Sequence, residues 1–283
     1  EPKVRLATHA ILRGLSPASP ESCRVLELGC NNGMNLLSMA LAAPGIEAVG
    51  VDLAERPVEE GNRIAADLGI RNVRLIVGDA AQPDAAWGTF DYVIAHGVYS
   101  WVPAPVREGL LETVRRTLRP DGVAYVSYSV YPGAYARRML REMMLLYAGA
   151  SPGGGDPVRR GVELLRALST VPWRQDKPFD AWIRSEVEER LSCPPEFLRH
   201  DDFADVNEPC WFHEFARSAA SHGLRFLGEA EWPENMDAAL SDGLGAALRG
   251  IADPLAREQM RDLLRVRRFR ESLLVHEGRV PGE

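Results

Sequence analysis

The stretch from Arg24 to Asn35, which reads RVLELGCNNGMN, constrains the fold more than any other part of the chain. A short apolar run leads into a turn bounded by Gly29 and Gly33, and a second apolar run with helical spacing begins at Met34. Glycine at both ends lets the backbone turn sharply and lets a ligand approach the amides. The first turn of the following helix presents unpaired N–H groups that suit a carboxylate or phosphate. The stretch therefore predicts a strand, a turn that holds an anionic group, and a helix.

The residues inside this turn separate two kinds of ligand. A dinucleotide fingerprint requires G-x-G-x-x-G, whereas Cys30, Asn31 and Asn32 stand between the two glycines here. Glu27 adds negative charge where a pyrophosphate would lie, and it suits a cationic group better. The pattern disfavours a dinucleotide and favours a ligand that is partly cationic. A purely structural strand-to-helix connection remains the alternative.

Further strands and helices alternate after this unit. Apolar segments typical of buried parallel strands occur at 47–52, 73–77, 90–95 and 123–130. Amphipathic helices are predicted between them, at 57–68 and 105–118. This alternation predicts five strands of a doubly wound α/β sheet.

Polar residues follow three of these strands. Asp52 lies roughly twenty residues past the glycine turn, where an acidic side chain accepts both ribose hydroxyls of a nucleoside. Asp79 follows the next strand, with a helix N-cap as its alternative role. The fourth strand runs into a loop from His96 to Trp101. Ligands bind beyond the carboxyl ends of such strands, so substrate chemistry is expected on this loop.

The chain after residue 133 departs from the simple alternation. We predict a sheet-forming core at 1–133, a helical insertion at 134–209, and a return to the core at 210–283. The returning part contains strands at 224–230 and 269–276, with helices at 236–249 and 254–264 between them.

Composition narrows the possible partners and compartment. The formal net charge of −7 gives no general attraction to nucleic acid or to an acidic membrane, and no basic patch is evident. No apolar run reaches the ~20 residues of a membrane span, and no signal-peptide pattern occurs. The four cysteines form no C-x-x-C pair, and Arg217 breaks the H-E-x-x-H pattern that starts at His213. We expect a cytoplasmic protein without a metal site.

Several phrases of the sequence together resemble one protein family. They include ELGCNNGMN, VGVDLAERPVEEGNRIA, FDYVIAHGVYSWVP and FLRHDDFADVNEPCWFHEFARSAASHGLRFLGEAE. The chain resembles bacterial class I methyltransferases that carry a methyltransferase regulatory domain, among them rickettsial protein lysine methyltransferases. The similarity covers most of residues 24 to 278. It implies a seven-stranded Rossmann-like sheet whose last strand is antiparallel, with S-adenosylmethionine as methyl donor and S-adenosylhomocysteine as product.

The same resemblance implies the site residues. Those expected to bind the cofactor are Glu27, Gly29, Cys30, Asn31, Asn32, Gly33, Asp52, Leu53, Asp79, Ala80 and His96. His96 would lie beside the methyl-bearing sulfur, as a general base or as a loop residue that contributes a backbone contact. Those relatives are longer than this chain, and Asn31 or Asn32 replaces their usual second glycine.

Four aromatic residues lie at or just beyond the carboxyl ends of the fourth and fifth predicted strands: Tyr99, Trp101, Tyr128 and Tyr131. An apolar aromatic pocket disfavours an ammonium group, which helps a lysine lose its proton, and aromatic faces attract cations. With His96, these rings form the predicted catalytic set for methylation of a protein lysine or related amine. The alternative is that they pack the insertion against the sheet.

Two other functions remain open at this point. The chain is alternatively a methyltransferase for a small molecule, with the insertion as its lid. It is alternatively a non-catalytic S-adenosylmethionine-binding protein whose helical insertion binds a partner. A dehydrogenase is disfavoured by Glu27 and by the missing glycine.

Overall fold

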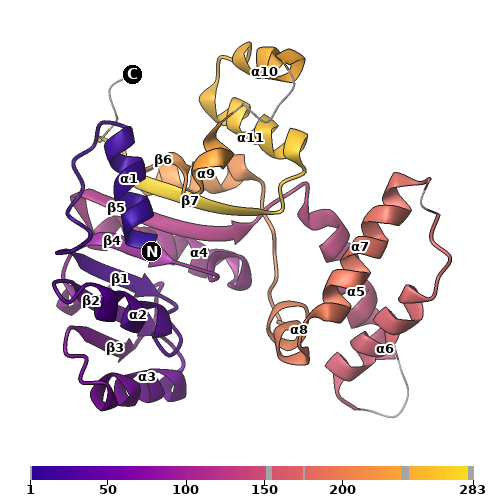
Figure 1. Ribbon diagram of the computed structural model, residues 1–283, viewed down its shortest axis with the longest axis horizontal. Helices are drawn as coiled ribbons and strands as arrows, with labels where there is room; N and C mark the ends of the chain where they lie inside the picture. The colour runs from indigo at the N-terminus through magenta and orange to yellow at the C-terminus, as the bar shows by residue number, and fades with distance from the viewer. Residues whose placement is uncertain (1, 151–154, 175, 237–241, 280–283) are drawn as a thin grey trace.

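A mixed seven-stranded sheet forms the centre of the protein, as shown by a computed structural model that describes residues 2–150, 155–174, 176–236 and 242–279 (Figure 1). The strand order is β3-β2-β1-β4-β5-β7-β6. Strands β1 to β5 pair in parallel, and β7 pairs antiparallel with both β5 and β6. The strands are β1 (Arg24–Leu28), β2 (Glu47–Asp52), β3 (Val73–Val77), β4 (Phe90–Ala95), β5 (Leu118–Ser129), β6 (Leu224–Glu229) and β7 (Phe269–His276). This topology confirms the predicted Rossmann-like methyltransferase fold.

Helices cover both faces of the sheet. Helices α1 (Pro2–Leu12), α2 (Met34–Ala42) and α3 (Glu55–Asp67) pack on one face, in a cluster with Val25, Ile94 and Tyr125. Helices α4 (Ala104–Thr117) and α9 (Phe212–Ser221) pack on the other, with a short 3-10 turn at Ala85–Trp87. Side chains alternate between the two clusters along each strand. Successive residues of β4 or β5 therefore face opposite sides of the sheet, one towards α1 and the next towards α4.

Apart from shifts of one or two residues at element ends, the observed elements differ from the predicted ones in three places. Strand β5 begins at Leu118 rather than at 123, because Leu118 pairs with Phe90 before a register shift. A short helix, α8 (Pro195–Asp201), forms where the periodicity predicted none. The predicted helix at 236–249 lies partly outside the described residues. Its described part is α10 (Asp242–Arg249), preceded by a 3-10 turn at Trp232–Asn235.

Helices α5 (Ala134–Ala150), α6 (Pro157–Ser169), α7 (Pro178–Ser192) and α8 follow β5 and lie beside the sheet (Figure 1). They share a separate apolar cluster that includes Leu140, Met144 and Leu165. The chain then runs back along the end of β5, where Cys210 bridges to Val130. Helix α11 (Pro254–Arg265) precedes β7. Within the described residues, none of the helices is both long and apolar enough to cross a membrane.

Candidate active site

The turn between β1 and α2 is shaped by its glycines. Gly29 and Gly33 both have positive φ, of 73° and 69°. A Cβ on Gly29 would lie 2.4 Å from Cγ2 of Val98, so the loop after β4 presses against the turn. Helix α2 starts after Gly33 without a side-chain cap. The amides of its first turn therefore stay available for an anionic group of a ligand.

Three other residues of the turn contribute mainly through the backbone. The Asn32 N–H donates to Asn31 Oδ1 at 2.7 Å, and Asn31 has a positive φ of 52°. The Cys30 side chain is buried, and burial raises the pKa of its thiol to about 12. Cys30 is therefore a packed thiol, not a nucleophile.

Glu27 carries the most unusual group of the site. Its side chain is buried, and Oε1 accepts a hydrogen bond from Asn35 Nδ2 at 2.8 Å. The second oxygen, Oε2, is also buried and has no hydrogen-bond partner among the described residues. Burial raises the pKa of this carboxyl to about 7, against the smaller opposing effect of Asn35. A buried carboxylate oxygen without a donor is costly, and a cationic or N–H-bearing ligand would satisfy it.

Asp52, at the end of β2, holds two loops together. Its Oδ2 accepts from the Asn31 N–H at 2.7 Å and its Oδ1 from the Ala54 N–H at 2.8 Å. Each oxygen keeps a second lone pair for a hydroxyl of a ligand. The neighbouring Leu53 is 71% exposed, and Val77, the register partner of Asp52 on β3, is 49% exposed. The ends of β2 and β3 thus place the exposed apolar side chains of Leu53 and Val77 beside the Asp52 carboxylate.

Asp79 organises the turn after β3. Its Oδ1 accepts from the Ala81 N–H at 2.9 Å and its Oδ2 from Gln82 Nε2 at 2.8 Å. Ala80 packs against the cluster on the α4 face of the sheet. Both residues lie at the same edge of the sheet as Asp52 and the glycine turn, because parallel strands end together.

A cavity of about 220 Å³ lies beside Glu27, and its polar walls bring together side chains from distant parts of the chain. They are Arg5, Glu27, Asn35, His96, Tyr125 and Glu271. The Tyr125 hydroxyl donates to Glu271 Oε1 at 2.6 Å, and the oxygen of this Tyr125 hydroxyl lies 3.0 Å from His96 Nδ1. Burial and Glu271 raise the pKa of Tyr125 well above its ordinary value, so its hydroxyl stays protonated.

The hydrogen bonds favour one tautomer of His96. The Tyr125 proton points to Glu271, so an Nδ1–H of His96 can donate to the Tyr125 oxygen, and Ser127 Oγ lies 3.4 Å from the same nitrogen. In the neutral ring, Nε2 then has a free lone pair. The His96 side chain is exposed at the carboxyl end of β4. This nitrogen can accept a proton from a group at the site.

The structure places two of the predicted pocket aromatics in the core instead. Tyr99 is 4% exposed and Tyr128 is fully buried, and both pack with Phe215 of α9 on the α4 face of the sheet. Contrary to the expectation, neither ring lines the cavity beside Glu27. Tyr128 faces the α4 side of β5, and Tyr99 lies in a 3-10 turn, Tyr99–Trp101, that packs on the same cluster. Tyr125 and Tyr128 are three residues apart on β5, so they face opposite sides.

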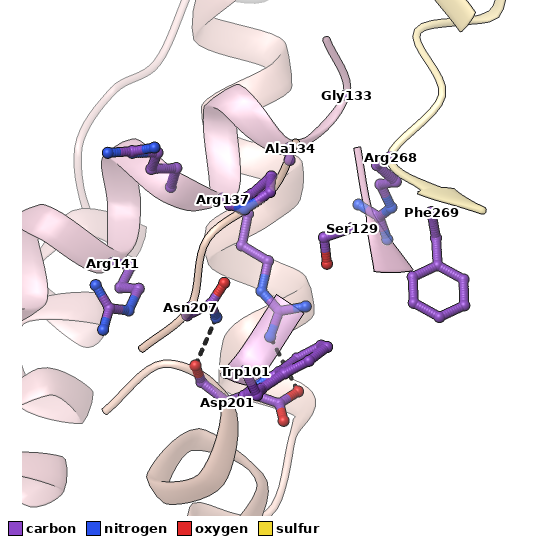
Figure 2. A pocket seen from close by; sticks show the side chains of 12 residues that line it. Trp101, Ser129, Gly133, Ala134, Arg137, Arg141, Asp201, Asn207, Arg268 and Phe269 are labelled. Carbon is purple, nitrogen blue, oxygen red and sulfur yellow. Dashed lines mark hydrogen bonds and ion pairs between the residues drawn. The ribbon is translucent and has the colours of Figure 1, made fainter. Parts of the chain in front are cut away.

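The other two aromatics lie where the helices α5 to α8 join the sheet. Tyr131 is 8% exposed and packs between Tyr135 and Trp211, with ring centroids 4.4 and 5.5 Å away. Trp101 lines a second cavity, of about 280 Å³, with residues of α5 (Figure 2). Neither ring is among the residues that line the cavity beside Glu27.

Sequence reasoning missed Arg5, Tyr125 and Glu271. The alternation of side chains along β5 could have identified Tyr125, because Tyr125 and Ser127 are two residues apart and face the same side of the sheet. No local signal marks Glu271, because its place follows from the antiparallel register that sets it opposite Ser127. In the described parts of the chain, no group of three or more His, Cys, Asp or Glu residues is arranged to hold a metal ion.

Comparison with known proteins gives two matches to families. Residues 25–122 match a family described as "Methyltransferase domain". Residues 194–276 match one described as "Predicted methyltransferase regulatory domain". The chain is 31% identical to the Rickettsia prowazekii protein RP028 over 222 residues, which is 78% of this chain and 89% of that protein. It is also 31% identical to RP789 of the same organism over 271 residues, or 96% of this chain and 49% of RP789.

A solved structure shows the same arrangement. PKMT2 from Rickettsia typhi, in complex with AdoHcy, superposes with a TM-score of 0.91 at 30% identity. The match covers 100% of this chain and 54% of PKMT2, so the chain spans about half the length of PKMT2 and of RP789. With the sheet topology and both matched regions, these similarities show that the chain belongs to the class I methyltransferases that carry a methyltransferase regulatory domain.

Proposed function

We propose that this protein binds S-adenosylmethionine at the edge formed by β1, β2 and β4 and transfers its methyl group to an amine, of which a protein lysine is the favoured case. The observation that carries the proposal is the buried Oε2 of Glu27, which no described residue meets with a hydrogen bond, beside the start of α2, which has no side-chain cap. The similar PKMT2 is described in complex with AdoHcy.

The described residues fit the groups of this cofactor. The α2 amides suit its carboxylate, Glu27 its ammonium, and Asp52 its ribose hydroxyls. The exposed Leu53 and Val77 offer apolar contact to the adenine, and Asp79 lies at the same edge. When bound, the cofactor supplies an electrophilic methyl group on a positively charged sulfur.

The protein's own contribution is alignment and proton removal. Good alignment of reacting groups supplies roughly 7 to 11 kcal/mol in intramolecular reactions. A lysine must also lose a proton, and its ordinary pKa is about 10.4. His96 Nε2 is the group proposed to take that proton, with Tyr125 and Glu271 holding the ring.

A small-molecule acceptor is the second candidate, because the cavity of about 220 Å³ has the size of a small side chain or metabolite. Incubation with methyl-labelled S-adenosylmethionine and a cell lysate separates the two. Label in the protein fraction that survives acid hydrolysis as methyl-lysine supports the proposal. Label confined to metabolites supports the second candidate. No label in either fraction, together with cofactor binding, contradicts both.

Asp52→Ala is expected to weaken the binding of S-adenosylmethionine by more than tenfold, or about 1.4 kcal/mol, because it removes the ribose acceptor and the bond to the Asn31 amide. Isothermal titration calorimetry measures the change. Glu60→Ala is the matched control, since it removes an exposed carboxylate of α3. Equal affinities in the wild type and Asp52→Ala would refute the ribose assignment.

Tyr125→Phe is expected to slow methyl transfer about tenfold while changing cofactor affinity less than twofold. The substitution removes the oxygen that joins His96 to Glu271. Single-turnover rates and calorimetry give the two numbers. Tyr92→Phe is the control, because it also removes a buried tyrosine's hydrogen bond, to the Ala18 carbonyl, away from the cavity. Equal slowing in both variants would mean that Tyr125 acts only through stability.

A further inference from the structure

The cavity behind Trp101 is separate from the one beside Glu27 and shares none of its lining residues. It lies between the end of β5 and helices α5 and α8, and its volume is about 280 Å³ (Figure 2). Its walls include Trp101 and Ser129 from the sheet edge and Phe269 at the start of β7. Nothing in the proposed methyl transfer uses this space.

The charge of the lining is predominantly positive. Arg137, Arg138 and Arg141 come from α5 and Arg268 from the segment before β7, against one carboxylate, Asp201, among the described lining residues. Arg137 already pairs with Asp201 at 3.0 Å, as Figure 2 shows, and with Asp202 at 3.3 Å. Arg268 pairs with Glu186 and Glu189 on α7. These two arginines are largely neutralised by the protein itself.

Arg141 is different. Its Nη2 donates to the Ala204 carbonyl, and its Nε is buried without a hydrogen-bond partner among the described residues. No described carboxylate forms an ion pair with it. Among the described residues, Arg138 pairs with Glu142, at 3.1 Å on the exposed surface of α5, and donates to the Tyr131 hydroxyl. Exposed ion pairs of this kind contribute little to stability, so a ligand can replace Glu142 at little cost.

Two aromatic residues also line this cavity. Trp101 and Phe269 present aromatic rings to the cavity, and Phe269 is 40% exposed. A guanidinium binds a carboxylate or phosphate through two parallel N–H bonds, and aromatic faces bind flat apolar groups. We propose that this cavity binds a small organic anion, in which a carboxylate or phosphate contacts Arg141 and Arg138 while an apolar ring packs on Trp101 and Phe269.

Calorimetry on the ligand-free protein tests the proposal independently of methyl transfer. The probes are phenyl phosphate, benzoate and, as a neutral analogue, benzyl alcohol. At least one of the two anions is expected to bind with a Kd below about 1 mM, and benzyl alcohol at least tenfold more weakly. Tighter binding of phenyl phosphate identifies the group as a phosphate, and tighter binding of benzoate identifies it as a carboxylate.

Variants locate the bound anion. Arg141→Gln is expected to weaken binding at least tenfold and Arg138→Gln at least threefold, while Arg159→Gln, an exposed arginine of α6, leaves it unchanged. Should Arg141→Gln fail to fold because its bond to Ala204 is lost, Arg138→Gln decides the question. The proposal is overturned if neither anion binds the wild type, if benzyl alcohol binds as tightly as the anions, or if Arg138→Gln binds the better anion as the wild type does.

Discussion

Replacing Glu27 by Gln is expected to weaken binding of S-adenosylmethionine at least tenfold at pH 7.5 and to remove most of the pH dependence of that binding. The carboxyl has a pKa of about 7 in the free protein because it is buried. Such a group is about 3% ionised at pH 5.5 and about 75% ionised at pH 7.5. The ligand's ammonium pairs with the ionised form, so the wild-type Kd should fall about 25-fold between these pH values.

The same substitution should stabilise the ligand-free protein at neutral pH. The pKa of Glu27 is raised on folding from an ordinary value of 4.5 to about 7. The folded state therefore binds the proton more tightly, and the stability contribution of this carboxyl is lost as pH rises from about 4.5 to 7. Glu27→Gln should raise the free energy of unfolding by about 3 kcal/mol at pH 7.5 and by little at pH 4.5.

Titration calorimetry at pH 5.5 and 7.5 measures the change in Kd. Urea unfolding at pH 4.5 and 7.5 measures the change in the free energy of unfolding. Glu60→Gln, which changes an exposed carboxylate of α3, is the control and should follow the wild type in both experiments. A wild-type Kd that stays constant from pH 5.5 to 7.5, or a Glu27→Gln protein that binds as tightly as the wild type, would contradict the proposed role of Glu27.

Replacing Arg270 by Met is expected to lower the free energy of unfolding by about 3 to 5 kcal/mol, because it removes a buried guanidinium that three carboxylates share and leaves them only the pairs with Arg261 and Arg267. The Arg270 side chain is fully buried on β7 and pairs with Glu229 at 2.6 Å, Asp262 at 2.8 Å and Glu258 at 3.0 Å. Its guanidinium also lies 4.0 Å from the centre of the Phe212 ring. These contacts join β6, β7, α9 and α11.

Urea unfolding at pH 7.5 checks this value. Arg279→Met is the matched control, because the Arg279 pair with Asp121 is half-exposed on both sides, and such pairs are worth roughly 0 to 1 kcal/mol. A loss below 1 kcal/mol in Arg270→Met would show that the network does not hold these elements together. Since Glu271 follows Arg270 directly on β7, the variant should also disturb the cavity beside Glu27.

The sequence predicted the sheet well because its signals are local. Short apolar runs bounded by turns gave the bounds of β2, β3, β4 and β7 to the residue. The start of β5 was missed, since a register shift opposite Phe90, not apolar content, allows Leu118 to pair. The helix α8 was missed because its seven residues are too few to show a helical period in the sequence.

The residues of the site also divide into those that local sequence signals identified and those that they did not. Glu27, Asp52 and Asp79 were identifiable because each acidic residue lies in or just after one strand near the carboxyl edge. The assignment of aromatic residues was unreliable, because nearness to a strand end does not tell which face a ring takes. Tyr128 faces the core and Tyr125 faces the cavity. The contact of Tyr125 with Glu271, 146 residues away, depends on the pairing of β5 with β7, which no local pattern records.

A crystal structure of the protein with S-adenosylhomocysteine tests the central claim most directly. The distance to be measured joins Glu27 Oε2, which has no partner among the described residues, to the amino nitrogen of the ligand. We predict a hydrogen bond of about 2.7 to 3.2 Å, with the ribose hydroxyls on Asp52. A ligand bound elsewhere, or an amino group turned away from Glu27, would contradict the account.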